Sequence, residues 1–303
     1  MGMTKNQLEL IEYVARNDLK KAKQAALACC AEDTTQKNHR EIRYCENLLN
    51  SKGLNMVELP VKISAFCTME DLSMTFLENR YYLTKEEENI FTLIKNMHTV
   101  SLQLMEKCIP YVNATLLYGE SGVGKTEFSR YVAYKMNMPY LYVNFSRMVD
   151  SYLGNTAKNI AALFDFLAEN RCVVMLDELD SIATKRKYAE GSASGELARS
   201  TTCLLQMLDA VSNEHIILGA TNLIDEIDPA VKRRFTEKHE IHRLRENEIY
   251  EFIVQFLEDA GYPYDDECVK EYAKGKHSQA EIMTHVTRCI AEMLILNEDE
   301  VIV

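Results

Sequence analysis

A glycine-rich segment, GESGVGKTEF at residues 119–128, directly follows an apolar run, ATLLY at residues 114–118. The segment matches the pattern GxxxxGK[ST] in the strand–loop–helix setting that this pattern requires. Its glycines, Gly119, Gly122 and Gly124, allow the backbone to curl so that its N–H groups point at phosphate oxygens, helped by the positive end of the following helix. The spacing therefore predicts a phosphate-binding loop, and a glycine-rich turn that binds nothing is the weaker alternative.

We expect nucleotide contacts along the whole loop, which comprises Gly119, Glu120, Ser121, Gly122, Val123, Gly124, Lys125 and Thr126. Lys125 would reach the β- and γ-phosphates, and the Thr126 hydroxyl would ligate Mg²⁺. Further along, CVVMLDELD ends another apolar run with Asp177 and Glu178. A carboxylate at the tip of a buried strand is costly unless a charged partner meets it, and a metal-bound nucleotide is such a partner.

These two acidic residues receive different predicted roles. We assign Asp177 to Mg²⁺, partly through water, and Glu178 to polarising the water that attacks the γ-phosphate. A lone Asp-Glu pair is weak evidence, but in combination with the upstream loop it predicts ATP hydrolysis, with ATP and Mg²⁺ as cofactors.

Short apolar runs separated by helical segments continue after the loop, which is typical of strands buried on both faces of a parallel sheet. The five runs are ATLLY (114–118), YLYVNF (140–145), CVVML (172–176), HIILGA (215–220) and a weaker EKHEIH (237–242). They predict an α/β domain at residues 84–243 with a parallel five-stranded sheet. Three helical segments after it predict a small C-terminal helical domain at residues 244–303.

The stretch before this domain is mostly helical. A capping box, TKNQ at residues 4–7, opens the first of three helical segments, which predict a small helical domain at residues 1–53. Residues 54–83 have no clear period and are interpreted as a linker that packs on the domain after it. A second capping box, TKEE at residues 84–87, should start a long helix that stops before Pro110.

Composition and charge exclude several classes of protein. The net charge is −12 and basic runs are short, so a general nucleic-acid-binding role is disfavoured. The chain has no run of 18 apolar residues and no apolar signal core at its start, so neither membrane insertion nor secretion is expected. Nine cysteines without a CxxC pair indicate a reducing compartment, and a cytoplasmic location is expected. His239 and His242 are interpreted as strand residues rather than metal ligands.

Two further segments, MLDELDSIA (175–183) and LGATNLIDEIDPAVKRRF (218–235), resemble the AAA subfamily of the AAA+ ATPases, with the layout of spastin- and katanin-type members. The resemblance covers residues 84–300 and includes HSQAEI (277–282), which is similar to the family's lid motif. It implies an AAA+ P-loop core with a C-terminal helical lid, and it weakly likens residues 1–53 to the helical adaptor modules of such remodellers.

The resemblance also implies roles for three polar residues. Asn222 would be the sensor that orients the lytic water, and Arg233 and Arg234 would be arginine fingers. An inserted arginine can raise the rate of nucleotide hydrolysis about 10³–10⁵-fold, and the family places these arginines at a subunit boundary. The implied active form is a homo-oligomeric ring, most simply a hexamer, with two solvated arginines as the alternative.

Three positions depart from the family pattern. Gln279 replaces the second glycine of the lid motif, Glu281 replaces its aspartate, and Leu223 follows the ATN segment in place of a basic residue. The two lid changes put the family's contacts near the adenine or ribose in doubt. None of the three alters the residues assigned to phosphate chemistry.

The turn VDSYLG at residues 149–154 resembles the aromatic–hydrophobic–glycine loop that lines the ring pore in AAA ATPases acting on polypeptides. Tyr152 would grip substrate with Leu153 as its companion, because an aromatic ring gives large contact area at small entropic cost. The alternative is that Tyr152 folds back onto the lid or the edge of the sheet. A second pore segment is expected within residues 185–196.

Together these features predict an ATP-driven ring motor that remodels, unfolds or translocates protein substrates. The chain shows no HExxH motif, so any proteolysis would need a separate protease or effector partner. The rival interpretations are a DNA-associated AAA+ protein, of the helicase-loader or transposition-regulator type, and a nucleotide-gated scaffold. The tail, NEDEVIV at residues 297–303, could add as a strand to a partner, but a frayed acidic terminus is favoured.

Overall fold

The computed structural model describes residues 3–15, 19–32, 42, 59–73, 75–109, 111–149, 155–184, 192–296 and 300–303. The chain divides into two compact units, Met1–Glu58 and Leu59–Val303.

In the first unit, α1 (Lys5–Ala15) packs against α2 (Leu19–Glu32). The capping box at its start is confirmed, because the Gln7 N–H donates to Thr4 Oγ1 at 3.4 Å and the Thr4 N–H donates to Gln7 Oε1 at 3.0 Å. The third helix predicted here lies outside the described residues except for Ile42.

A six-stranded sheet forms the core of the second unit, in the order β1-β3-β4-β5-β2-β6. Its strands are β1 (Cys67–Glu70), β2 (Asn113–Tyr118), β3 (Tyr140–Asn144), β4 (Val173–Asp177), β5 (Ile216–Thr221) and β6 (Glu237–Glu240). Strands β2 to β6 pair in parallel, close to the bounds predicted for all five. The predicted α/β class is therefore confirmed.

The sheet nevertheless has one strand more than predicted, and that strand is antiparallel. β1 pairs with β3 so that Cys67 lies opposite Val143 and Glu70 lies opposite Tyr140. It falls within residues 54–83, so the interpretation of that stretch as a linker is corrected for its described part. A strand of four residues is too short for periodicity to distinguish it from a turn.

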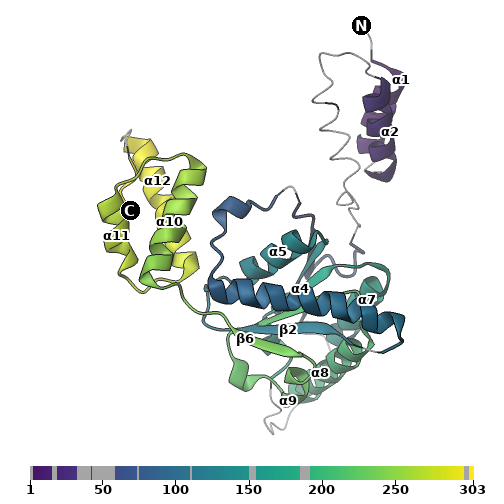
Figure 1. Cartoon of the computed structure of the whole chain (residues 1–303). Helices are drawn as coiled ribbons and strands as arrows, with labels where there is room; N and C mark the ends of the chain where they lie inside the picture. Colours follow the sequence, from purple (N-terminus) through teal and green to yellow (C-terminus); the bar gives the residue numbers. More distant parts are fainter. Residues whose placement is uncertain are drawn as a thin grey trace. The chain divides into compact units, whose positions relative to one another are not determined.

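Helices cover both faces of the sheet, and Figure 1 shows α4 and α5 on one side of the strands and α8 on the other. Their bounds are α4 (Lys85–Glu106), α5 (Lys125–Met136), α6 (Phe145–Met148), α7 (Asn155–Glu169), α8 (Ser192–Ala210) and α9 (Pro229–Lys232). Short 3₁₀ turns are η2 (Glu78–Arg80), η3 (Leu179–Ser181) and η4 (Ile224–Glu226). The second capping box is confirmed, since the Thr84 N–H donates to Glu87 Oε2 at 2.9 Å and the Glu87 N–H donates to Thr84 Oγ1 at 3.1 Å.

Sheet and helices share one large apolar cluster. Ile90 of α4 and Phe128 of α5 pack there with Leu117, Met175 and Leu218 from three neighbouring strands. Burying such side chains contributes about 1.5–3 kcal/mol each. This packing fixes the strand ends, on which the candidate site is built.

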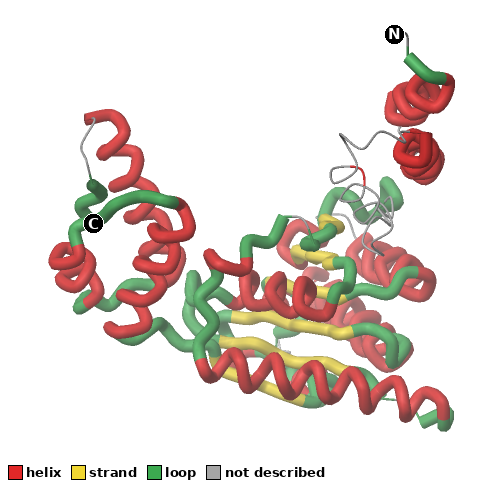
Figure 2. The backbone as a smooth tube through the Cα atoms, turned by 45° about the horizontal axis from the view of Figure 1, so that its top comes forward, coloured by secondary structure: helices red, strands yellow, loops and turns green. Residues whose placement is uncertain are grey.

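The C-terminal helices are α10 (Glu246–Ala260), α11 (Asp266–Ala273) and α12 (Gln279–Leu296), and Figure 2 shows this part of the chain without strands beside the strand-rich core. They enclose their own apolar core, which includes Leu257, Val269 and Val286. We call residues 244–303 the lid.

The tail folds back onto the lid. The Val301 N–H donates to Pro263 O at 2.8 Å, the Asp265 N–H donates to Val301 O at 3.0 Å, and Val301 is fully buried. The expectation of a frayed terminus is therefore wrong for residues 300–303. Among the helices whose residues are described, none has the length and apolar character to cross a bilayer.

Candidate functional site

The predicted phosphate-binding loop connects β2 to α5 and has the required backbone conformation. Gly119, Gly122 and Gly124 have φ values of +147°, +78° and +99°, a range that side chains other than glycine rarely adopt. Lys125 then begins α5, so the loop ends at the positive end of a helix. The local sequence therefore produces the curled loop that it predicted.

The Lys125 ammonium group lies inside this loop. Its Nζ donates to Gly119 O at 2.9 Å, to Glu120 O at 2.7 Å and to Asn222 Oδ1 at 2.8 Å. Burial lowers the pKa of Lys125, and the nearby charge of Asp177 acts in the opposite direction. Asn222 follows the end of β5, so the sheet brings the predicted sensor to the loop.

Asp177 ends β4 and faces the first turn of α5. Its Oδ2 accepts a hydrogen bond from Thr126 Oγ1 at 3.2 Å, and its Oδ1 accepts one from the Glu178 N–H at 2.9 Å. Glu178 itself has a φ of +56°, an unusual conformation for a residue with a side chain and one that clusters at functional sites. The two predicted acidic residues therefore lie beside the loop with distinct surroundings.

The oxygen atoms beside the loop suit Mg²⁺. A threonine hydroxyl and a carboxylate are hard donors, and Mg²⁺ in nucleotide sites takes one or two such protein ligands together with phosphates and water. In the described part of the chain, no group of three or more His, Cys, Asp or Glu side chains could hold a metal. Thr126 and Asp177 therefore fit a cation that arrives with a nucleotide.

A cavity of about 640 Å³ extends from the loop into the space between core and lid. Its lining includes residues of the phosphate loop and of the strand ends: Ser121, Gly122, Gly124, Lys125, Thr126, Asp177, Glu178 and Asn222. It also includes the aromatic and aliphatic residues Phe76, Leu77, Tyr81, Tyr82, Phe252, Phe256 and Met283. A cavity that offers both a phosphate loop and aromatic rings suits a nucleotide.

The aromatic and aliphatic lining was not predicted from the sequence. Four of its residues lie within residues 75–82, inside the supposed linker, and the other three lie on lid helices. The only sequence signal was the run of aromatic residues in FLENRYY at residues 76–82.

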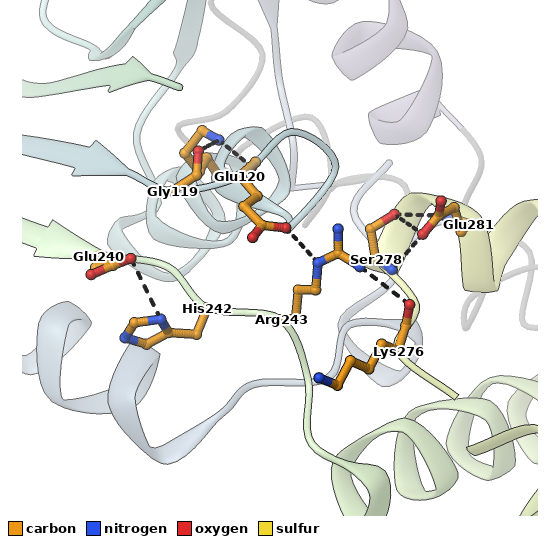
Figure 3. Close-up of polar contacts among 9 residues, drawn as sticks. Gly119, Glu120, Glu240, His242, Arg243, Lys276, Ser278 and Glu281 are labelled. Atoms are coloured by element: carbon orange, nitrogen blue, oxygen red, sulfur yellow. Dashed lines mark hydrogen bonds and ion pairs between the residues drawn. The ribbon is translucent and has the colours of Figure 1, made fainter. Parts of the chain in front are cut away.

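The lid is attached to the phosphate loop by an ion pair, shown in Figure 3. Arg243, in the segment that joins β6 to α10, donates from Nε to Glu120 Oε2 at 2.6 Å and from Nη1 to Lys276 O at 3.2 Å. One guanidinium group thus connects the phosphate loop to the residues before α12. The sequence carries no signal for this contact, because it joins segments far apart in the chain.

Of the two lid positions that depart from the family pattern, Gln279 lies directly against the loop, next to a lid residue that is bonded to it. The Ala280 N–H donates to Gly122 O at 3.1 Å, and a Cβ on Gly124 would lie 2.0 Å from Gln279 Oε1. Glu281 accepts from the Ser278 N–H at 2.7 Å and thereby helps cap α12, as Figure 3 shows. The carboxamide of Gln279 therefore occupies space beside the phosphate loop that a glycine would leave open.

The predicted arginine fingers lie elsewhere. Arg234 is bound within its own chain by Asp209, with Nε–Oδ1 at 3.0 Å and Nη2–Oδ2 at 2.8 Å, and this pair raises the pKa of Arg234 and lowers that of Asp209. Arg233 is exposed, and neither arginine lines the cavity. Tyr152 and Leu153 lie outside the described residues.

A buried parallel strand, a curled glycine loop with its lysine, and an acidic strand end beside that loop define a P-loop nucleotide-binding domain. Residues 115–243 match the model of the ATPase family associated with various cellular activities, AAA. This part of the chain is therefore an AAA-family ATPase domain, and the resemblance to the AAA+ ATPases is confirmed.

Similar proteins carry related names. An AAA family ATPase of Sinorhizobium fredii, named y4kL and described as uncharacterized, is 31% identical over 61% of this chain and 56% of its own length. The 26S proteasome regulatory subunit 10B homolog A of Arabidopsis thaliana is 37% identical over 42% of this chain and 33% of its own. The peroxisomal ATPase PEX6 of the same plant is 35% identical over 40% of this chain and 13% of its own length. The chain thus matches little more than half of the first relative and smaller parts of the others.

Proposed function

We propose that this chain binds ATP with Mg²⁺ and hydrolyses the ATP to ADP and phosphate. The observation that carries this proposal is that residues at the ends of β4 and β5 contact the loop that follows β2. Lys125 of the loop contacts Asn222 after β5, and Thr126 contacts Asp177 at the end of β4. A structural glycine turn would have no use for a buried ammonium group, an amide and a carboxylate at one place.

Each of these residues has a proposed task in hydrolysis. Mg²⁺, when bound, would offset the charge of the phosphates, with Thr126 and Asp177 as its protein ligands. Lys125 would hold the β- and γ-phosphates, Glu178 would polarise the attacking water, and Asn222 would orient that water. Positioning and electrostatic stabilisation account for nearly all of the catalysis in such reactions.

We further propose a homo-oligomeric ring, with six subunits as the simplest form, in which Arg233 and Arg234 serve the nucleotide of the neighbouring subunit. Both arginines lie away from the cavity of their own chain, which supports a role in another subunit. Because Arg234 is engaged by Asp209, the exposed Arg233 is the better placed of the two to reach a neighbour.

The proposed substrates are proteins. Support comes from the names of the relatives, among them a 26S proteasome regulatory subunit and a proteasome-activating nucleotidase of Haloferax volcanii. Tyr152 and Leu153 would line the ring pore, and residues 1–53 would recognise targets. A separate protease or effector would be a partner, the location would be cytoplasmic, and the net charge of −12 argues against a DNA-associated role.

The variant Glu178→Gln tests hydrolysis. It should bind ATP normally but release phosphate at least about a hundredfold more slowly, because the water loses its base. Glu169→Gln is the matched control, since Glu169 is an exposed residue at the end of α7. Phosphate release by Glu178→Gln at the wild-type rate would refute the proposed role.

Mixed subunits test the ring. Arg233→Ala subunits and Glu178→Gln subunits should each be inactive alone and should recover phosphate release when mixed, because each supplies what the other lacks. A lack of recovery at every mixing ratio would show that the arginines act within their own chain. In the same assembly, Tyr152→Ala should hydrolyse ATP without unfolding a tagged test protein, and unimpaired unfolding would exclude the pore role.

A further inference from the structure

A tyrosine on β3 contacts the candidate metal-binding carboxylate. The Tyr142 hydroxyl donates to Asp177 Oδ2 at 3.1 Å, and the same oxygen accepts from Thr126 Oγ1. We propose that Tyr142 is a positioning residue that holds the Asp177 carboxylate in place and so sets the affinity of the site for Mg²⁺ with nucleotide. This inference rests on the proposed function, because it places a nucleotide at the phosphate loop.

The strand register explains why a tyrosine is required. β3 and β4 run in parallel with Asn144 opposite Asp177 and Tyr142 opposite Met175. Residues two apart on a strand share a face and are separated by about 6.6 Å along it. Only a long side chain at position 142 can run along the sheet to the carboxylate at its edge and still present a hydroxyl group.

The direction of the hydrogen bond between Tyr142 and Asp177 follows from the hydrogen bonds of the neighbouring Asn144. The Arg147 N–H can only donate, and it donates to Asn144 Oδ1 at 2.9 Å at the start of α6. The other end of that carboxamide, Nδ2, therefore faces the Tyr142 hydroxyl, to which it donates at 3.4 Å. Because the hydroxyl accepts from Asn144, its single proton is left for Asp177.

Asp177 consequently receives three donors from this chain. Thr126 and Tyr142 donate to Oδ2, and the Glu178 N–H donates to Oδ1. A carboxylate held in this way keeps its orientation while its remaining lone pairs stay available. Removing a partner that orients a metal ligand typically costs about 10–100-fold in metal affinity. Since Tyr142 is half-buried and Asp177 keeps two other donors, we expect the lower end of this range.

The test is the variant Tyr142→Phe, which removes only the hydroxyl. Binding of a fluorescent ADP analogue is titrated with Mg²⁺ and is also measured in EDTA. We expect the midpoint of the Mg²⁺ titration to rise about tenfold, as for loss of an orienting partner, with the affinity in EDTA unchanged. A midpoint equal to that of the wild type would overturn the proposal, and so would an equal loss of affinity with and without Mg²⁺, which would indicate a merely structural role.

Two further variants sharpen the result. Tyr118→Phe is the control, because Tyr118 of β2 is also a half-buried strand residue but is not among the described residues that donate to Asp177. Its Mg²⁺ midpoint should equal that of the wild type, and a shift as large as that of Tyr142→Phe would overturn the specific role. Asn144→Ser keeps an acceptor for the start of α6 but removes the amide donor, so its midpoint should rise less than that of Tyr142→Phe. A larger rise would mean that Asn144, rather than Tyr142, holds the carboxylate.

The two proposals fail in different ways. ADP binding requires no hydrolysis, so a wild-type chain that binds ADP with Mg²⁺ but releases no phosphate from ATP would refute the proposed function and still test Tyr142. Conversely, a wild-type chain that hydrolyses ATP, together with a Tyr142→Phe variant of unchanged Mg²⁺ midpoint, would refute only the inference.

Discussion

The ion pair between Arg243 and Glu120 should control how firmly the lid closes on a bound nucleotide. The side chains of Glu120 and Arg243 are 65% and 41% exposed, and exposed pairs of this kind contribute about 0–1 kcal/mol. The additional hydrogen bond from Arg243 to Lys276 O favours the upper end of this energy range. Because a difference of about 1.4 kcal/mol is tenfold in an equilibrium constant, loss of the pair should weaken nucleotide affinity by up to about fivefold.

A double-mutant cycle measures this contribution directly. Arg243→Gln and Glu120→Gln should each weaken binding of a fluorescent ADP analogue, and the double variant should be no weaker than either single variant. Exchanging the charges, with Glu120→Arg and Arg243→Glu together, should recover part of the affinity. The difference between wild type and Arg243→Gln should also shrink as salt is raised, because the pair is exposed to solvent.

Arg245→Gln is the matched control for the cycle. Arg245 also links lid and core, through an ion pair with Glu86 at 2.9 Å, but Glu86 belongs to α4 rather than to the phosphate loop. This variant should leave nucleotide affinity within about twofold of the wild type, as expected for a weak exposed pair. Single-variant effects that simply add, with no dependence on salt, would refute the argument that the pair connects lid position to nucleotide binding.

Three other consequences are measurable. Burial lowers the pKa of His215 below its ordinary 6.5, so His215 takes up a proton in the unfolded state before it does so in the folded state. As the pH is lowered from about 6.5, the free energy of unfolding should therefore decrease, by at most about 1.4 kcal/mol per pH unit. His215→Gln should reduce this pH dependence, as measured in urea titrations. Gly219→Ala should destabilise the core by about 1–3 kcal/mol, because a Cβ there would lie 2.5 Å from Leu179 Cδ1, and an unchanged urea midpoint would contradict this. Arg233→Ala should lower phosphate release more than Arg234→Ala, because Arg234 is already held by an ion pair; the opposite order would contradict this.

The elements that could be predicted are those whose signal is local. The phosphate loop, the five parallel strands and both capping boxes each depend on residues within a few positions of one another, and all formed near their predicted bounds. β1 was missed because its four residues carry no readable period. The tail was misjudged because its acidic residues suggested solvation, whereas the burial of Val301 depends on a lid that is formed by other segments.

The site was predictable only as far as its motifs reach. The sequence indicated Lys125, Thr126 and Asp177, because phosphate and metal chemistry restricts the residue types that can stand there. It did not indicate Tyr142, which reads as one more apolar strand residue until the register places its hydroxyl at Asp177. It equally missed Arg243, whose partner lies in a loop more than a hundred residues earlier in the chain.

These missed contacts have a shared consequence for how the domain works. Arg243 and the Ala280 N–H both attach lid residues to the phosphate loop, and the lid also supplies part of the cavity wall. Lid position and nucleotide binding are therefore linked equilibria, and the linkage must be reciprocal. If a docked lid raises nucleotide affinity about fivefold, nucleotide must stabilise the docked lid by the same factor. Exchange of the nucleotide for its product would thus move the lid without any separate switch if the two differ in how strongly they favour the docked over the undocked lid.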